Sequence, residues 1–273
     1  MLHHETSRTR AGGAFAILER IFHASVRNVR KSHGNAVIGL LLNILQTVVL
    51  VAVFYLMFEL LGLRSMALRG DFLLYLMSGI FLFLVHIKTV GAVAGAEGPT
   101  SPMMKHAPMN TVISISSVAL GTLYLQILSG GIVLFFYHAL VTPVVIEDPV
   151  GAVAMLLMAW FTGVGVGVVL LALKPWLPDL VGLLTLIYQR MNMVASGKMF
   201  LANMLPTSML RLFDWNPLFH TIDQARGFTF LNYNPHYTSI SYPLYVGIGC
   251  LMLGLIGEYY TRRHASLSWG AKR

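Results

Sequence analysis

The chain has 273 residues, of which 56% are hydrophobic and only 11% are charged, and its mean hydropathy is +0.70. Soluble domains carry about 25% charged residues, so this composition excludes an ordinary soluble domain and indicates a membrane protein. The formal net charge of +8 would favour nucleic-acid binding in a soluble protein, but here the basic residues flank apolar segments. At such positions they set topology and contact anionic lipid headgroups, so we expect membrane lipid and no nucleic acid as a partner.

The first 35 residues form a predicted cytoplasmic segment with an amphipathic helix over residues 14–33. One stripe of that helix is largely apolar and the opposite face is basic. The apolar stripe contains Leu18, Ile21, Phe22, Ser25 and Val29, and the basic face contains Arg20, His23, Arg27, Arg30 and Lys31. This pattern predicts either a helix in the membrane interface or a cytosolic helix packed on a partner.

Six apolar segments follow, each long enough to cross a bilayer as a helix. A hydrocarbon core of ~30 Å takes about 20 residues at ~1.5 Å per residue, and an unbroken helix satisfies its own backbone there. The six predicted spans are residues 36–61, 72–94, 111–140, 149–173, 180–204 and 242–260. The predicted fold class is therefore an all-α integral membrane protein, with a six-helix transmembrane domain over residues 36–260.

The distribution of Lys and Arg predicts the orientation of this domain. Six basic residues precede the first span (Arg8, Arg10, Arg20, Arg27, Arg30 and Lys31), and four lie in the tail over residues 261–273 (Arg262, Arg263, Lys272 and Arg273). Positive residues in short flanking segments stay on the cytoplasmic side. We therefore predict that both termini are cytoplasmic and that the tail is a basic cytoplasmic extension.

Two connecting segments differ from the rest. Residues 95–110, between the second and third spans, are polar and interrupted by prolines, which break a helix into short pieces. Residues 205–241 form the longest external connection and are moderately apolar, with several aromatic residues and prolines. Such a segment enters the outer leaflet as short helices when protein or water satisfies its backbone.

The sequence contains no recognisable catalytic constellation. No G-x-x-x-x-G-K-[ST] segment occurs, so the chain has no P-loop of its own. The histidines in or near the spans, His86 and His138, lack ligand-like spacing, and Cys250 is the only cysteine. We expect no catalytic residue, no metal and no cofactor bound by this chain. Gly163 and Gly167 have the G-x-x-x-G spacing that allows helices to approach closely.

The fifth predicted span carries an unusual number of polar residues. Tyr188, Gln189, Asn192 and Ser196 lie close to one face of an otherwise apolar helix, followed by Asn203. Polar residues are costly in lipid and usually face a cavity or another helix. This face is interpreted either as part of a hydrated pathway or as a helix–helix interface.

The segment WNPLFHTIDQARGFTF, over residues 215–230, resembles the permease subunits of ABC exporters for capsular polysaccharide. Trp215, Asn216 and Pro217, followed by leucine, match one element of that family. Asp223 and Arg226 match a second, an acidic residue and an arginine three positions apart. This spacing places the two side chains on one helix face as a predicted ion pair. The resemblance covers the C-terminal half in detail and the whole chain in layout.

The resemblance implies a transport subunit rather than an enzyme. Two copies of the chain would associate with two nucleotide-binding subunits, which bind ATP and Mg, in a bacterial inner membrane. Periplasmic and outer-membrane export proteins are further implied partners, and the substrate is a lipid-linked polysaccharide. Coupling to the ATPase is assigned to Glu97, Pro99, Pro102, Lys105 and His106. The outer gate is assigned to Trp215, Asn216, Pro217, Asp223 and Arg226, and the pathway to Tyr188, Gln189, Asn192 and Ser196.

Other functions are compatible with the same pattern. Within the exporter class, the cargo could be O-antigen, a teichoic-acid-type polymer, a lipid or a drug. A membrane-embedded glycosyltransferase or acyltransferase would need an acid–base pair that the sequence does not reveal. An assembly factor without a pathway would not need the segment over residues 95–110 for export.

Overall fold

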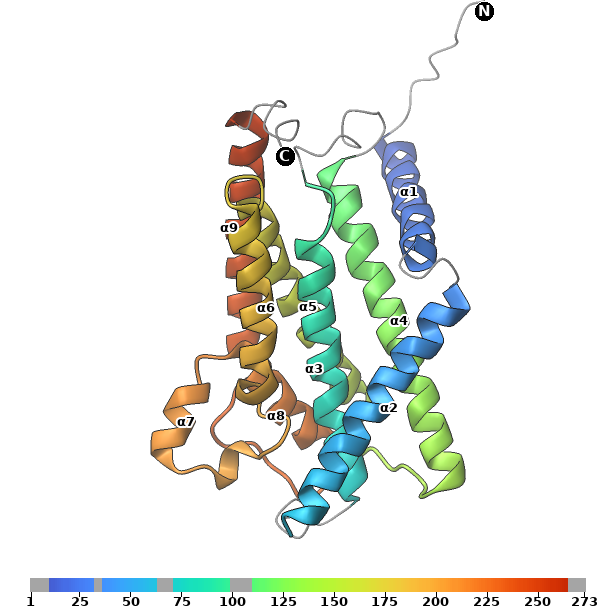
Figure 1. Ribbon diagram of the computed structural model, residues 1–273, viewed down its shortest axis with the longest axis vertical. Helices are drawn as coiled ribbons and strands as arrows, with labels where there is room; N and C mark the ends of the chain where they lie inside the picture. Colours follow the sequence, from blue (N-terminus) through green and yellow to red (C-terminus); the bar gives the residue numbers. More distant parts are fainter. Residues whose placement is uncertain (1–9, 32–35, 63–70, 99–109, 265–273) are drawn as a thin grey trace, which may run out of the picture.

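The computed structural model describes residues 10–31, 36–62, 71–98 and 110–264. All regular structure in these ranges is helical, which confirms the predicted all-α class (Figure 1). The long helices are α1 (Arg10–Lys31), α2 (Ala36–Leu60), α3 (Phe72–Ala94), α4 (Thr111–Leu140), α5 (Pro149–Leu173), α6 (Pro178–Ala195) and α9 (Ser241–His264). A 3₁₀ turn (Ala202–Met204) and the short helices α7 (Thr207–Phe213) and α8 (Pro217–Thr229) lie between α6 and α9.

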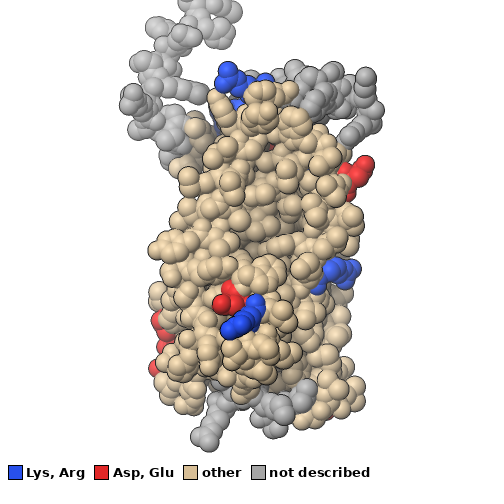
Figure 2. Space-filling view, turned by 90° about the vertical axis from the view of Figure 1, so that its left-hand side faces the viewer, with Lys and Arg blue, Asp and Glu red and all other residues tan. Residues whose placement is uncertain are grey.

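Five helices of the described chain are long and apolar enough to cross a membrane: α2, α3, α4, α5 and α9. Helices α3, α4 and α5 have the bounds predicted from the sequence, and α2 and α9 differ from the prediction by a few residues. Figure 2 shows one flank of the bundle, on which charged side chains are few and scattered. The chain is therefore a membrane protein with an apolar helical bundle.

The predicted unbroken span over residues 180–204 is wrong. Helix α6 ends at Ala195, and it is not among the five helices that meet the length and hydropathy of a span. Gly197 has φ of +73°, a left-handed conformation that ends right-handed helices and that only glycine adopts without strain. The Phe219 ring also fills the space that a Cβ at Gly197 would need. The chain then turns back towards α7 and α8.

Helix α3 lies at the centre of the bundle and contacts α2, α4, α5, α6 and α8. Its buried face includes Leu76, Met77 and Ile80, each 1% exposed. Helix α5 packs closely on α3, because a Cβ at Gly163 would lie 2.9 Å from the carbonyl oxygen of His86, and one at Gly167 would lie 2.7 Å from Val93 Cβ. The close helix approach predicted from the G-x-x-x-G spacing is confirmed.

Helix α1 lies alongside α4 and does not cross the end of the bundle (Figure 1). Ala24 is buried, and the Asn28 amide donates to Ser117 Oγ at 3.0 Å. Leu18 and Phe22 remain more than 60% exposed. Helix α1 thus packs on the bundle through Ala24 and Asn28, while Leu18 and Phe22 of the predicted apolar stripe point outward, and a position in the membrane interface stays a prediction.

The two ends of the bundle are different. Helix α1 and the C-terminal end of α9 lie at one end, whereas α7 and α8 lie at the opposite end (Figure 1). The predicted short helices within residues 205–241 are confirmed as α7 and α8. Together with the turn after α6 and the segment up to α9, we call these helices the cap (residues 196–240).

Candidate functional site

The WNPL motif forms the N-terminus of α8. Asn216 is the N-cap residue, and its side-chain oxygen accepts from the Leu218 amide at 3.0 Å. Pro217 occupies the first turn, where its missing N–H and fixed φ are tolerated. The Asn216 side-chain nitrogen donates to Asn192 Oδ1 at 2.9 Å and to the Ala195 carbonyl at 2.8 Å. The same side chain therefore caps α8 and joins it to the last turn of α6.

Arg226 binds the turn that ends α6. Its guanidinium donates to the backbone carbonyls of Gly197 at 2.8 Å, Lys198 at 2.6 Å and Phe200 at 2.7 Å. The side chain is fully buried, and its Cζ lies 4.2 Å from the centre of the Tyr75 ring on α3. The planar fork of Arg suits several carbonyl acceptors at once. Arg226 thus replaces the helical hydrogen bonds that α6 loses at this turn.

Asp223 binds segments on both sides of α8 in sequence. Its Oδ1 accepts from the Tyr233 hydroxyl at 2.5 Å and the Ala202 amide at 3.3 Å, and its Oδ2 accepts from the Thr238 hydroxyl at 2.8 Å. Burial, and then the neighbouring carboxylate, raises the pKa of Tyr233, so the phenol stays protonated and donates. Asp223 holds the chain before and after α8 against that helix.

The predicted ion pair between Asp223 and Arg226 is not formed. Both residues are described, and the structure gives each side chain a separate set of partners. The three-residue spacing does place both on the buried side of α8. However, Arg226 donates to the carbonyls of the turn after α6, and Asp223 accepts from hydroxyls in the segment between α8 and α9. These partners take the place of the ion pair.

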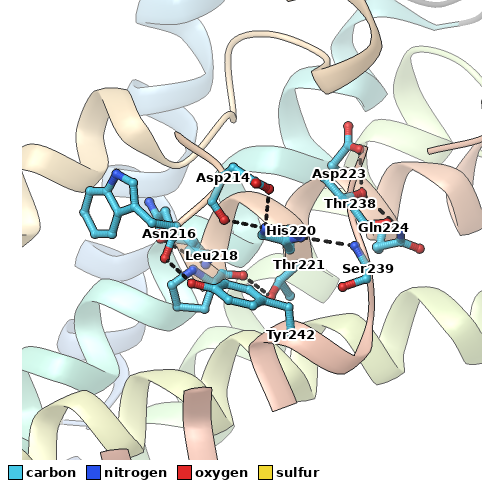
Figure 3. A network of polar contacts seen from close by, with 12 residues as sticks. Asp214, Asn216, Leu218, His220, Thr221, Asp223, Gln224, Thr238, Ser239 and Tyr242 are labelled. Atoms are coloured by element: carbon cyan, nitrogen blue, oxygen red, sulfur yellow. Dashed lines mark hydrogen bonds and ion pairs between the residues drawn. The ribbon is translucent and has the colours of Figure 1, made fainter. Parts of the chain in front are cut away.

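A second polar network closes the cap against α9, and Figure 3 shows its side chains. The Ser239 amide donates to His220 Nδ1 at 3.1 Å, so the ring is neutral and its Nε2–H donates to the Asp214 carbonyl at 2.7 Å. The Tyr242 hydroxyl donates to the Trp215 carbonyl at 2.7 Å. These contacts hold the α7–α8 corner on the first turn of α9.

Lys198 is buried in the turn that opens the cap. Its ammonium donates to the Met193 carbonyl and lies 4.0 Å from the centre of the Phe83 ring. Gly79 on α3 makes the space, because a Cβ there would lie 3.0 Å from Lys198 Cα and 2.8 Å from an Arg226 nitrogen. Two cationic side chains are therefore packed against aromatic rings of the central helix, an arrangement that favours cations.

The predicted pathway residues contact neighbouring helices. The Nδ1–H of His86 donates to the Ala159 carbonyl, so His86 Nε2 accepts from the Tyr188 hydroxyl at 2.8 Å. Gln189 donates to the Ile87 carbonyl at 3.1 Å. Asn192 and Ser196 are buried at the base of the cap. These hydrogen bonds match the helix–helix interface interpretation, and a hydrated pathway along this face stays a prediction.

Only part of the predicted coupling segment can be placed. Glu97 follows α3 and is half-buried, whereas Pro99, Pro102, Lys105 and His106 lie outside the described residues. The Lys174 ammonium, just after the end of α5, donates to the carbonyl oxygen of Ala96 at 3.5 Å. The α3–α4 and α5–α6 connections thus meet at the end of the bundle opposite the cap.

Sequence reasoning found Asn216, Asp223 and Arg226 but missed several partners. Four further side chains stabilise the cap through hydrogen bonds, as the motif residues do: Tyr233, Thr238, His220 and Tyr242. His220 lies within α8, and the other three follow that helix in the sequence. No local signal points to them, because each forms its contact across 10 to 27 residues of sequence. Long-range contacts between loops have no periodic pattern in sequence.

Comparison with models of known protein families gives no match, and a search of curated proteins gives none either. The site must therefore be interpreted from its own geometry. The polar side chains described above form internal hydrogen bonds that shape the cap. By contrast, the aromatic side chains of Trp215 and Tyr237 are each 55% exposed, and exposed aromatic rings present apolar faces to a ligand.

Proposed function

We propose that this chain is the membrane-spanning permease subunit of an ATP-driven exporter that moves a lipid-linked capsular polysaccharide out across a bacterial inner membrane. The observation that supports this proposal most strongly is the role of the motif residues. Asn216, Asp223 and Arg226 are each 2% exposed or less, and each joins α8 to a different part of the chain. The sequence that resembles the exporters is therefore the sequence that builds a cap over one end of the bundle.

The proposed topology has six crossings, with α6 as a short sixth crossing. Its 18 residues extend about 27 Å, slightly less than the ~30 Å hydrocarbon core. The buried turn at residues 196–201 would span the remaining thickness of that core. An even number of crossings leaves both termini on the cytoplasmic side, as the basic flanks favour. The cap then lies on the external side.

This topology predicts the labelling of single cysteines in a Cys250→Ser background. With sealed vesicles of right-side-out orientation, a membrane-impermeant maleimide should label Asn232→Cys, in the exposed part of the cap, and should leave Asp179→Cys unlabelled until the vesicles are lysed. Both positions are exposed, so access depends on the side of the membrane. Labelling of both residues in intact vesicles would show that α6 does not cross.

The transport mechanism follows from this arrangement. Two copies of the chain would enclose the pathway, and two separate nucleotide-binding subunits would bind ATP and Mg and dock at the end that carries the α3–α4 and α5–α6 connections. The hydrogen bond from Lys174 to the Ala96 carbonyl links those two connections. A docked ATPase would therefore act on α3 and α5 together, and coupling between two sites requires such a shared element.

Glu97→Gln tests this coupling. We expect the variant to insert normally but to lose about tenfold of its export activity, because one interaction at a coupling site is worth about 1.4 kcal/mol. Each variant is expressed in a strain that lacks the wild-type chain, and export is measured as polysaccharide at the cell surface. Without any variant, this strain should accumulate polymer inside the cell. The matched control, Glu147→Gln, removes an exposed carboxylate at the opposite end of the bundle and should export normally. Equal export by the two variants would contradict docking at this segment, and a deletion strain without internal polymer would contradict the cargo.

A further inference from the structure

A basic residue lies within a membrane-spanning helix, at a depth where cations are costly. Lys88 is on α3, six residues before the end of the helix at Ala94, or about 9 Å along its axis. Its ammonium donates to Asn43 Oδ1 at 2.8 Å and to Gln46 Oε1 at 2.5 Å, both on α2. The Gln126 amide of α4 donates to the same Asn43 oxygen at 3.1 Å. Three membrane-spanning helices therefore contribute to one polar cluster.

The cluster orients the positive charge of Lys88 but does not neutralise it. An ammonium carries three N–H donors, and neutral amide oxygens accept two of them. Among the described residues, no carboxylate pairs with Lys88. Ionisable residues within membrane-spanning helices are usually paired, and an unpaired one indicates a ligand site. The third donor of Lys88 is available to an anion.

The cluster opens on the surface of the bundle beside apolar side chains. Lys88 is half-buried and Gln46 is exposed, whereas Asn43 is buried behind them. On the same outer surface of α2, Leu42, Leu45 and Val49 are each between 46% and 57% exposed. An anionic group at Lys88 would thus have an apolar surface next to it, which suits a molecule with a charged head and an acyl or prenyl chain.

We infer that Lys88, Asn43 and Gln46 form a binding site for the phosphate headgroup of a membrane amphiphile. Two sources share this chemistry: a resident anionic phospholipid, and the lipid end of an exported polymer. The second source rests on the proposed function, whereas binding of the headgroup does not. Lys88 supplies the charge, and the amides hold its ammonium towards the surface of the bundle.

The test uses the full chain, purified and reconstituted in nanodiscs of phosphatidylcholine that contain phosphatidylglycerol as the probe. Native mass spectrometry gives the preference of the bound lipid for phosphatidylglycerol. Lys88→Met should lower that preference about tenfold, since a charge-assisted hydrogen bond is lost, and Lys88→Arg should keep it. Gln46→Glu should lower it as strongly as Lys88→Met, because the new carboxylate would pair with the lysine while leaving the fold intact.

The outcomes separate the possibilities. Equal preference in the wild type, Lys88→Met and Gln46→Glu would overturn the site. If the preference falls in both variants, lipid extracted from each purified protein identifies the source. Loss of unmodified anionic phospholipid from Lys88→Met would assign the site to a resident lipid, and loss of a sugar-bearing phospholipid would assign it to the cargo. Binding of the headgroup, and its assignment to a resident lipid, would stand even if the chain proved not to be a polysaccharide exporter.

Discussion

Arg226→Met is expected to destabilise the protein by more than about 3 kcal/mol and to abolish export. The substitution keeps most of the side-chain volume but removes the donors to the carbonyls of Gly197, Lys198 and Phe200. The carbonyls of Lys198 and Phe200 would lose these donors, whereas the Gly197 carbonyl keeps its bond from the Phe200 amide. Each buried carbonyl left without a partner costs about 1–3 kcal/mol. Unfolding in detergent, followed by the fluorescence of the four tryptophans, measures the loss.

Two further variants sharpen this prediction. Arg226→Lys should recover only part of the stability, because an ammonium is a point charge without the planar fork that stacks on Tyr75. Arg211→Met removes an exposed arginine from α7 and should change the unfolding free energy by less than about 0.5 kcal/mol. If Arg226→Met were as stable as Arg211→Met, Arg226 would not hold the turn. Exchanging the charges of Asp223 and Arg226 should give no rescue, since the two side chains do not pair.

Asp223→Ala is expected to cost about 3 kcal/mol, because it leaves three donors without an acceptor: the Tyr233 hydroxyl, the Thr238 hydroxyl and the Ala202 amide. Asp223→Asn should cost less, as it keeps one of the two acceptor oxygens. Exposed Asp214, whose side chain is 57% accessible in its contact with His220, provides the control. Asp214→Asn should cost less than about 1 kcal/mol.

A double-mutant cycle tests the contact between Asp223 and Tyr233 directly. Tyr233→Phe alone removes the hydroxyl, and in the presence of Asp223→Ala that hydroxyl has already lost its acceptor. The cost of the double variant should therefore be smaller than the sum of the two single costs by about 1 kcal/mol or more. Additive costs, measured by unfolding in detergent, would show that the two side chains do not interact.

The spans were predictable because their information is local. Helices α3, α4 and α5 have the predicted bounds, since Asp71, Asn110 and Asp148 cap their N-termini immediately before long apolar runs. The end of α6 was missed for a physical reason. Apolar residues continue past Ala195, and only the φ of Gly197 and the contacts made by Arg226, 29 residues further along the chain, end the helix there.

The same distinction applies to the cap. Asn216 was singled out through the resemblance of its motif, and its role as a capping residue before a proline is also a local signal. The expected pairing of Asp223 with Arg226 also came from a local rule, and it failed because residues distant in sequence supply stronger partners. Lys198 lies within the predicted span over residues 180–204. In the structure it lies in a turn against Phe83, where Gly79 leaves room for it.

The absence of a side chain at Gly79 also has a mechanical meaning. Lys198 and Arg226 fill the space that this glycine leaves on α3. The cap therefore cannot slide along the central helix unless both cationic side chains leave that space. The other end of the same 23-residue helix leads to Glu97. Helix α3, about 35 Å long, therefore joins the two ends of the molecule. If one end of this helix tilts, the other end moves with it.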